Sequence, residues 1–398
     1  MIKTLAITMV VVPFFLGTPT SGATSSEGEG NQIQGAPISG SPGRGRRLFG
    51  EKNCSICHAI LGKGGNIGLD LAMNSQQRSF NSLLSRFWDH SPELLKSMKK
   101  DPSQWTQFDS EDMRDLVCYI FYLNGYERLG DFLRGRKVFE SKGCAECHLV
   151  GTIGAEDGIV LDKFAASGSA LGFVTALWNR GSRMASHFRQ SDMERPRFSG
   201  TDAADLHAFL RGSVRKIEAN TDYMSPGKPS VGRQVFIDRG CATCHKVQGK
   251  GNPKKEGPDL RPKSLRLSVS EITGVLWNHG GLIWSSQADA EAEQVAKKVF
   301  TVDEMANLVA YLYSIAFFGE EGSAEIGRKL FRTRGCLSCH EDDDIEQIKD
   351  PIDVATKMWN HVHSKEGEDG EKQTWPRFTP EEAGHLARYL MSPKDEDK

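Results

Sequence analysis

One five-residue pattern recurs four times along the chain, and its residue types indicate a single kind of chemistry. Each copy has two cysteines separated by two residues, followed directly by a histidine. The copies are Cys54, Cys57 and His58; Cys144, Cys147 and His148; Cys241, Cys244 and His245; and Cys336, Cys339 and His340. This pattern is typical of c-type haem attachment. Two thioethers tether the porphyrin and the histidine provides one axial iron ligand, so we predict four covalently bound haem c groups.

A zinc site is the alternative for paired cysteines, because thiolates are common zinc ligands. Zinc would call for further cysteine pairs, yet eight of the nine cysteines already lie in the four copies. The ninth, Cys118, falls in an apolar helical pattern, which predicts a buried free thiol. Four copies with matching flanks therefore favour haem.

The chain has 398 residues and a formal net charge of -2, a balance that argues against a nucleic-acid partner. Its start has the pattern of a secretory signal, with Lys3, an apolar run over 5–16 and small residues at 21–23. An uncleaved membrane anchor is the alternative, but the run is about a dozen residues where a bilayer span needs roughly 20. We expect a signal peptide over 1–23 and export to the periplasm, with an extracellular or membrane-associated location as the alternative.

The flanks of the motif repeat as well, with a period of about 95 residues, which is the size of a small domain. Each copy opens on a glycine followed by an apolar pair at helical spacing, and we expect another helix to cross at that glycine. Each copy closes on a helix with one recurring aromatic residue. The opening glycines are Gly45, Gly135, Gly232 and Gly327, and the closing aromatics are Tyr119, Phe209, Tyr311 and Tyr389.

The closing helices have recognisable starts. Thr301 with Glu304 forms a capping box, and Thr379 is followed by proline at the first helical position. We place the other two starts at Asp109 and Ser199. Between motif and closing helix, each copy has a helical stretch that ends in a tryptophan, which we interpret as core packing. The four are Trp88, Trp178, Trp277 and Trp359.

No strand alternation of useful length is present, so we predict an all-α fold of four tandem helical domains, each around one haem. The domains are expected at 44–129, 130–220, 228–320 and 321–398. A flexible tether over 24–43, rich in Gly, Ser and Pro, precedes them.

This arrangement resembles the class I c-type cytochromes, with four such domains fused in tandem from Gly45 to the end of the chain. The resemblance implies that a Gly-Pro loop lies behind each motif histidine and that its carbonyl accepts the other ring N–H. The pair at 257–258 matches this loop, the pair at 68–69 lacks the proline, the second copy is looser and the fourth lacks the loop. The resemblance therefore implies that the fourth haem is the least enclosed.

The family usually places a methionine on the other side of the iron, and methionine raises the reduction potential. The resemblance implies Met98 in the first copy. In the second copy it implies Met184, with Met193 and His187 as alternatives.

The third and fourth copies have no suitable methionine. His279 and His361 are the candidates there, with His363 behind, and an open distal position is the alternative. Both share a sequence position with His90, an equivalence that favours a structural or haem-propionate role. His207 is interpreted as a core histidine.

Two function classes follow from these patterns. The first is an exported tetrahaem electron carrier that exchanges electrons with redox partner proteins in the periplasm or at the membrane surface, and it needs no catalytic acid or base. The second is an enzyme in which the third or fourth haem has an open site for a small oxidant such as peroxide or nitrite. The missing methionines motivate the second class.

Overall fold

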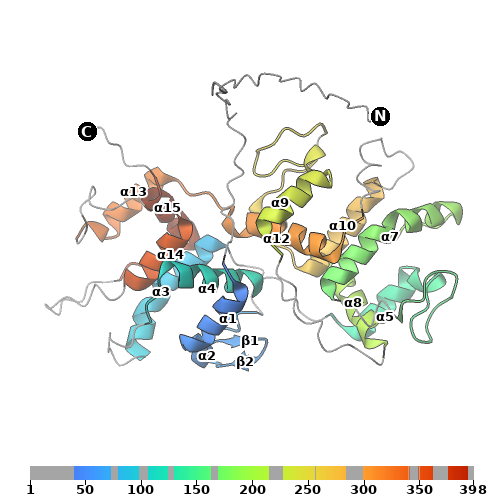
Figure 1. The fold of residues 1–398 in the computed structure, drawn as a ribbon, viewed down its shortest axis with the longest axis horizontal. Coiled ribbons are helices and arrows are strands. Elements are labelled where there is room, and N and C mark those ends of the chain that lie inside the picture. Colours follow the sequence, from blue (N-terminus) through green and yellow to red (C-terminus); the bar gives the residue numbers. More distant parts are fainter. Residues whose placement is uncertain are drawn as a thin grey trace, which may run out of the picture. The chain divides into compact units, whose positions relative to one another are not determined.

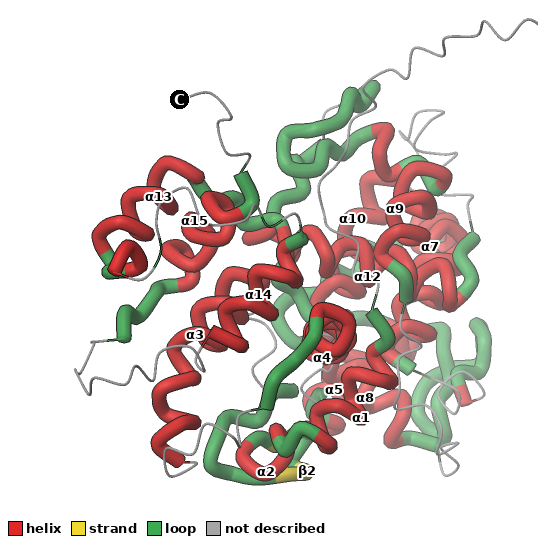
Figure 2. Tube along the Cα trace, turned by 60° about the vertical axis from the view of Figure 1, so that its left-hand side comes forward, coloured by secondary structure: helices red, strands yellow, loops and turns green. Residues whose placement is uncertain are grey.

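The computed structural model describes residues 40–72, 79–97, 106–123, 130–162, 169–214, 227–255, 257–283, 299–338, 340, 348, 350–361 and 375–392. Helices dominate these residues (Figure 2), which confirms the predicted all-α class. One short hairpin of β1 (Ala59–Ile60) and β2 (Lys63–Gly64) departs from the strand-free expectation. The predicted signal peptide over 1–23, and the tether up to residue 39, lie outside the described residues.

In every copy the opening helix packs against the closing helix (Figure 1). The four pairs are α1 (Pro42–Glu51) with α4 (Ser110–Tyr122), α5 (Phe132–Ser141) with α8 (Asp202–Gly212), α9 (Pro229–Asp238) with α12 (Val302–Phe318), and α13 (Ala324–Thr333) with α15 (Pro380–Leu390). Because α1 begins at Pro42, the last two residues of the predicted tether are helical.

The opening glycine is the point of closest approach, as predicted. A Cβ on Gly45 would lie 2.0 Å from the carbonyl oxygen of Asp115. The equivalent distances are 1.9, 1.9 and 2.0 Å for Gly135, Gly232 and Gly327. Four residues further along each opening helix, an aromatic ring packs on the recurring aromatic of the closing helix, for example Phe49 on Tyr119 with ring centres 5.9 Å apart.

A polar latch beside each crossing was not predicted. The residue at the N-cap of the opening helix donates its backbone N–H to a side chain of the closing helix, four residues before the recurring aromatic. The four bonds are Ser41 to Asp115 Oδ1 at 2.6 Å, Asp131 to Asp205 Oδ1 at 2.6 Å, Lys228 to Asn307 Oδ1 at 2.6 Å and Ser323 to His385 Nδ1 at 2.8 Å. The acceptor is a carboxylate, an amide or an imidazole, depending on the copy, yet the hydrogen bond is present in all four. This bond fixes the register of the two helices.

Three of the four predicted starts of closing helices are confirmed. Asp109, Thr301 and Thr379 are N-caps, and the latter two complete capping boxes. The start at Ser199 is wrong, because α8 begins at Asp202 with Thr201 as its N-cap. The side chain of Asp202 binds back to the Ser199 backbone and hydroxyl instead, forming a local turn before the helix.

The tryptophan helices are α3 (Phe80–Ser97), α7 (Ala170–Gln190), α10 (Val269–Ile283) and α14 (Pro351–Asn360). The expectation that each ends at its tryptophan is wrong for the first three, which continue beyond it. In α3, Pro92 has no N–H to donate to the carbonyl of Trp88. That carbonyl instead accepts the indole N–H of Trp375, at 3.2 Å.

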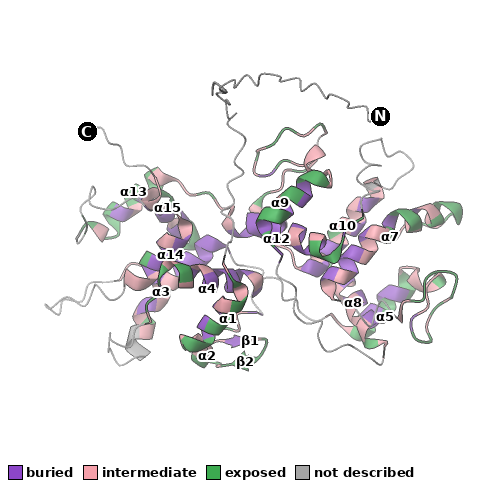
Figure 3. Ribbon diagram, in the orientation of Figure 1, coloured by how far each residue is buried: buried purple, intermediate pink, exposed green. Residues whose placement is uncertain are grey.

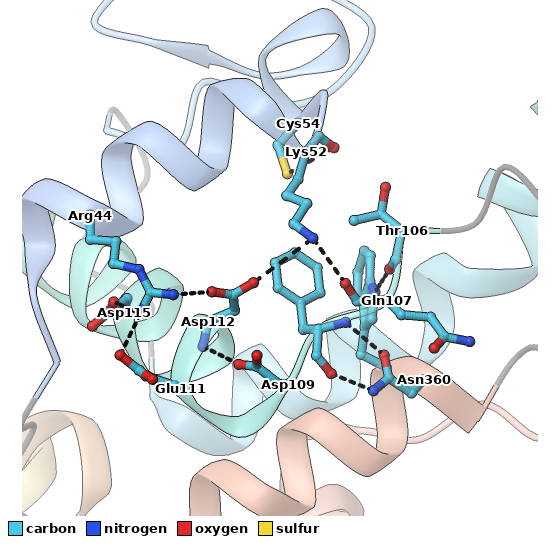
Figure 4. Close-up of polar contacts among 12 residues, drawn as sticks. Arg44, Lys52, Cys54, Thr106, Gln107, Asp109, Glu111, Asp112, Asp115 and Asn360 are labelled. Atoms are coloured by element: carbon cyan, nitrogen blue, oxygen red, sulfur yellow. Dashed lines mark hydrogen bonds and ion pairs between the residues drawn. The ribbon is translucent and has the colours of Figure 1, made fainter.

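The copies associate in two reciprocal pairs, the first with the fourth and the second with the third. In each pair the Asn or Asp after the tryptophan binds the backbone of the phenylalanine that precedes the partner's closing helix. Asn179 binds Phe300 and Asn278 binds Phe198. Each asparagine side chain donates one N–H to the backbone carbonyl of the phenylalanine and accepts its backbone N–H, at 2.7–2.9 Å. Asn360 binds Phe108 in the same two-bond way, and Figure 4 shows Asn360 beside the segment that contains Thr106, Gln107 and Asp109. Asp89, which has no amide N–H, accepts only the N–H of Phe378.

The helices that meet in these pairs contain many buried residues, coloured purple in Figure 3, and most of these residues are apolar. The closing helix α12 is the most completely buried, and Phe317 near its end packs against Phe80 of α3 and Phe121 of α4. No helix of the described residues has the length and apolar character needed to cross a bilayer.

Candidate haem sites

Each motif forms a single helical turn just after its opening helix. The residue before the first cysteine has a positive φ in all four copies, at Asn53 (64°), Gly143 (74°), Gly240 (88°) and Gly335 (83°), which reverses the chain direction. The turns are α2 (Cys54–Cys57), η4 (Cys144–Glu146), η5 (Cys241–Thr243) and η7 (Cys336–Ser338). In every copy the backbone N–H of the motif histidine donates to the backbone carbonyl of the first cysteine, at 2.9–3.1 Å. The turn therefore presents the first cysteine and the histidine together; Cys339 lies outside the described residues.

The ring of the motif histidine is oriented by a backbone carbonyl in three copies. Nδ1 of His58 donates to the carbonyl of Leu69 at 2.8 Å, that of His148 to Ile159 at 3.0 Å and that of His245 to Pro258 at 2.8 Å. Because a carbonyl can only accept, the proton is on Nδ1 and Nε2 is left free as a ligand. The loop of the second copy, which looked looser in sequence, makes the same bond. The corresponding loop of the fourth copy, 341–347, lies outside the described residues.

A glycine precedes each of these carbonyls, and the space it leaves is needed by the ring. A Cβ on Gly68 would lie 2.4 Å from Cε1 of His58, and one on Gly158 would lie 2.8 Å from Nδ1 of His148. The N–H of each glycine also binds back to the second cysteine of the motif, as Gly68 does to the Cys57 carbonyl at 2.8 Å. The loop therefore fixes both the ring and the cysteine pair.

The second copy has an apolar cavity of about 310 Å³ beside its motif. Cys144, Cys147 and His148 line it, together with Met184 and His187 of α7. Apolar side chains supply most of the remaining wall. A porphyrin needs such a surface next to a pair of thiols and a free imidazole nitrogen, so the residues fit haem c. Met193 is not among the residues lining the cavity.

Burial raises the pKa of the first cysteine of the motif, to about 11 for Cys54 and about 11 for Cys144. Cys118 is buried as predicted; burial raises its pKa to about 12, and its thiol lies 3.0 Å from the Gly40 carbonyl.

The histidines that come two residues after the tryptophans lie close to the motif histidines. Ring centres are 5.8 Å apart for His58 and His90, 5.7 Å for His245 and His279, and 5.7 Å for His340 and His361. These pairs are three copies of one arrangement. Burial, and then the neighbouring motif histidine, lower the pKa of His90 and His279, which favours the neutral form of both rings.

The second copy differs, because Arg180 stands at this position. Met184 and His187 follow on the same helix. His207 lies half-buried and stacked on Phe173, with ring centres 5.3 Å apart, and does not line the cavity. Met98 and His363 lie outside the described residues.

Residues 43–124 and 230–316 match the family model for cytochrome c. These regions, which span the first and third copies, are cytochrome c domains, a class whose members bind haem c covalently. Comparisons with curated proteins and with solved structures found no match. A haem bound at these sites would supply one-electron chemistry at its iron, and this chain's residues would tether it, orient the ligating ring and exclude water. The assignment of the individual site residues and the boundaries of the four domains stay predictions.

Proposed function

We propose that this chain is an exported tetrahaem c-type cytochrome that transfers electrons between redox partner proteins. The observation that supports it is the repeated unit of cysteine turn, carbonyl-oriented histidine and glycine, present in the two cytochrome c domains and also in the second copy. The fourth copy has the same turn and the same helix crossing. The chain accepts electrons one at a time from a reduced protein and delivers them to an oxidised one, in the periplasm or at the membrane surface.

Mass spectrometry of the denatured, exported protein tests the number of haems and the cleavage of the signal together. We expect four haem masses on a polypeptide that lacks residues 1–23. The paired change of Cys336 and Cys339 to alanine removes one haem mass, and the same change at Cys144 and Cys147 removes another. A mature protein with two haems, in the first and third copies only, would contradict the proposal.

The enzyme alternative rests on an open distal site in the third or fourth copy. His279 and His361 lie beside the motif histidines of those copies, which weighs against an open site. Ferric protein that turns over peroxide or nitrite, and binds cyanide at one haem without displacing a protein ligand, would favour the enzyme.

A further inference from the structure

We propose that His90, His279 and His361 are the second axial ligands of the first, third and fourth haem irons, and that only the second site uses methionine. The proposal rests on the proposed haem function. It replaces Met98 in the first copy, and it gives His279 and His361 the same role as His90.

The spacing of the facing rings supports ligation. An iron bound by one nitrogen from each of two imidazoles needs ring centres roughly 6 Å apart, given metal–nitrogen bonds of about 2 Å. The three observed separations are 5.7–5.8 Å. The agreement holds in three copies whose surrounding loops differ in length and sequence, so it belongs to the repeated helices and not to a local accident of packing.

The partner copy holds each of these histidines in place. The residues just before His279 are Trp277, whose indole N–H binds the Pro196 carbonyl at 2.7 Å, and Asn278, which binds Phe198. Trp88 and Asp89 before His90 make the equivalent bonds to Pro376 and Phe378.

Trp359 and Asn360 before His361 bind Thr106 and Phe108 in turn. The helix segment that carries the histidine is therefore anchored to the partner copy by the two residues before it. Such support by neighbouring groups is what orients a metal ligand in proteins.

The second copy provides an internal contrast. Arg180 occupies the equivalent position, and a guanidinium stays charged and cannot ligate iron. One turn later, Met184 reaches the cavity that also contains His148. Met184 and His187 both line this cavity, and we assign Met184 to the second iron, so that the single histidine–methionine signal decides between them.

The consequence is a division of reduction potentials. Methionine ligation raises the potential relative to histidine, so the second haem is expected to be the most oxidising of the four. The other three form a group of lower potential.

Near-infrared magnetic circular dichroism of the full ferric protein tests the ligand sets directly. We expect a dominant signal from two-histidine sites and a smaller one from a single histidine–methionine site. His279→Gly should convert one haem to high spin, and added imidazole should restore the low-spin signal. His207→Ala, which changes a histidine outside the cavity of the second copy, is the control and should leave the ligation unchanged.

His279→Met keeps a ligating atom and guards against a folding defect. It should move one haem from the two-histidine to the histidine–methionine signal and raise one midpoint potential. Four bound haems whose signals do not change in either variant would overturn the ligand assignment while leaving the proposed function intact. A wild-type protein that carries no bound haem would overturn both the ligand assignment and the proposed function.

Discussion

At the scale of single residues, a backbone carbonyl determines which nitrogen of the motif histidine can bind iron. The bonds from His58, His148 and His245 to Leu69, Ile159 and Pro258 each use Nδ1. The residue whose backbone carbonyl accepts the bond differs in each copy, and only the carbonyl and the preceding glycine are common to all three. The proline of the matching family loop is therefore dispensable, because the chain needs a carbonyl at that point and not a particular side chain.

Gly68→Ala should disturb this support in the first copy only. The new Cβ would lie 2.4 Å from the His58 ring, so the ring must shift and its bond to Leu69 must lengthen. Weaker hydrogen bonding lowers the basicity of the ligand, and the midpoint potential of one haem is expected to rise. Redox titration of the full chain measures this shift. Gly43→Ala is the control, since no atom lies near its Cβ, and an equal shift in both variants would contradict the prediction.

The sequence indicates candidate attachment residues, because covalent tethering requires cysteines and a histidine within one turn; their assignment stays a prediction. It was less informative on the distal side. The equivalence of His90, His279 and His361 is visible in the sequence, but an available methionine at Met98 favoured a structural role for all three. Only their distances from the motif histidines distinguish the two interpretations.

At the scale of secondary-structure elements, the crossing of opening and closing helices sets the position of every motif. The crossing glycines were predictable, because a glycine at helical spacing from an apolar pair has few other uses. The polar latch was harder to predict, since its acceptor is Asp115, Asp205, Asn307 or His385. Only the fixed distance of four residues to the recurring aromatic marks these positions as equivalent.

Two glycines of α1 provide a matched test of the crossing. Gly45→Ala would place a methyl group 2.0 Å from the Asp115 carbonyl, and overpacking of this kind costs about 1–3 kcal/mol. Gly50→Ala meets no atom within 4 Å, and alanine is favoured over glycine in a helix by up to about 1 kcal/mol. Denaturant unfolding should therefore give changes of opposite sign. Equal destabilisation by both variants would show that the crossing is not the cause.

The capping boxes of α12 and α15 should make stability depend on pH in acid. The backbone N–H of Thr301 lowers the pKa of Glu304, and that of Thr379 lowers the pKa of Glu382. Because the folded-state pKa is depressed, this contribution is fully present above the unfolded pKa and is lost as pH falls through the folded pKa.

The variant Glu304→Gln keeps the capping hydrogen bonds but removes the charge. Its free energy of unfolding should therefore fall less steeply than that of the wild type as the pH drops from about 5 to the folded-state pKa of Glu304. Thermal unfolding across this range measures the effect. Asp303→Asn, on the same helical turn but with an exposed side chain, is the control and should leave the curve unchanged.

At the scale of the whole molecule, the described residues form two reciprocal pairs of copies. The bond partners of each pair are separated by about 80–290 positions in the chain, and such contacts have no local sequence signal. One indirect signal was present: a phenylalanine precedes every closing helix, and an Asn or Asp follows the recurring tryptophan of each copy. These residues were recognisable as equivalent, but nothing in the sequence indicated that each binds a different copy.

The pairing also brings aromatic groups of the first and fourth copies together. Trp88 stacks on His361 with ring centres 5.4 Å apart, and on Trp375 at 4.4 Å. In the other pair, Arg195 occupies the place of Trp375 and lies over the ring of Trp277, at 4.2 Å. The tryptophans therefore pack as the sequence predicted, but they pack against residues of another copy. They do so at positions next to the proposed iron ligands.

A double-mutant cycle tests the pairing without reference to haem. Asn179→Ala and Asn278→Ala each remove two hydrogen bonds at the contact between the second and third copies. Leaving the backbone groups of Phe300 or Phe198 unsatisfied should cost about 1–3 kcal/mol in each single variant. Since the two residues stabilise the same contact, the double variant should be less destabilised than the sum, by about 0.5–3 kcal/mol of coupling.

The matched cycle combines Asn179→Ala with Asn360→Ala. The native Asn360 side chain binds Phe108 in the other pair of copies. These two changes lie in separate contacts and should add within about 0.5 kcal/mol. Denaturant unfolding of the full chain measures all the variants. Asn278→Asp, which reproduces the single-bond arrangement of Asp89, should fall between wild type and Asn278→Ala. Coupling of equal size in both cycles would show that the copies do not associate in two separate pairs.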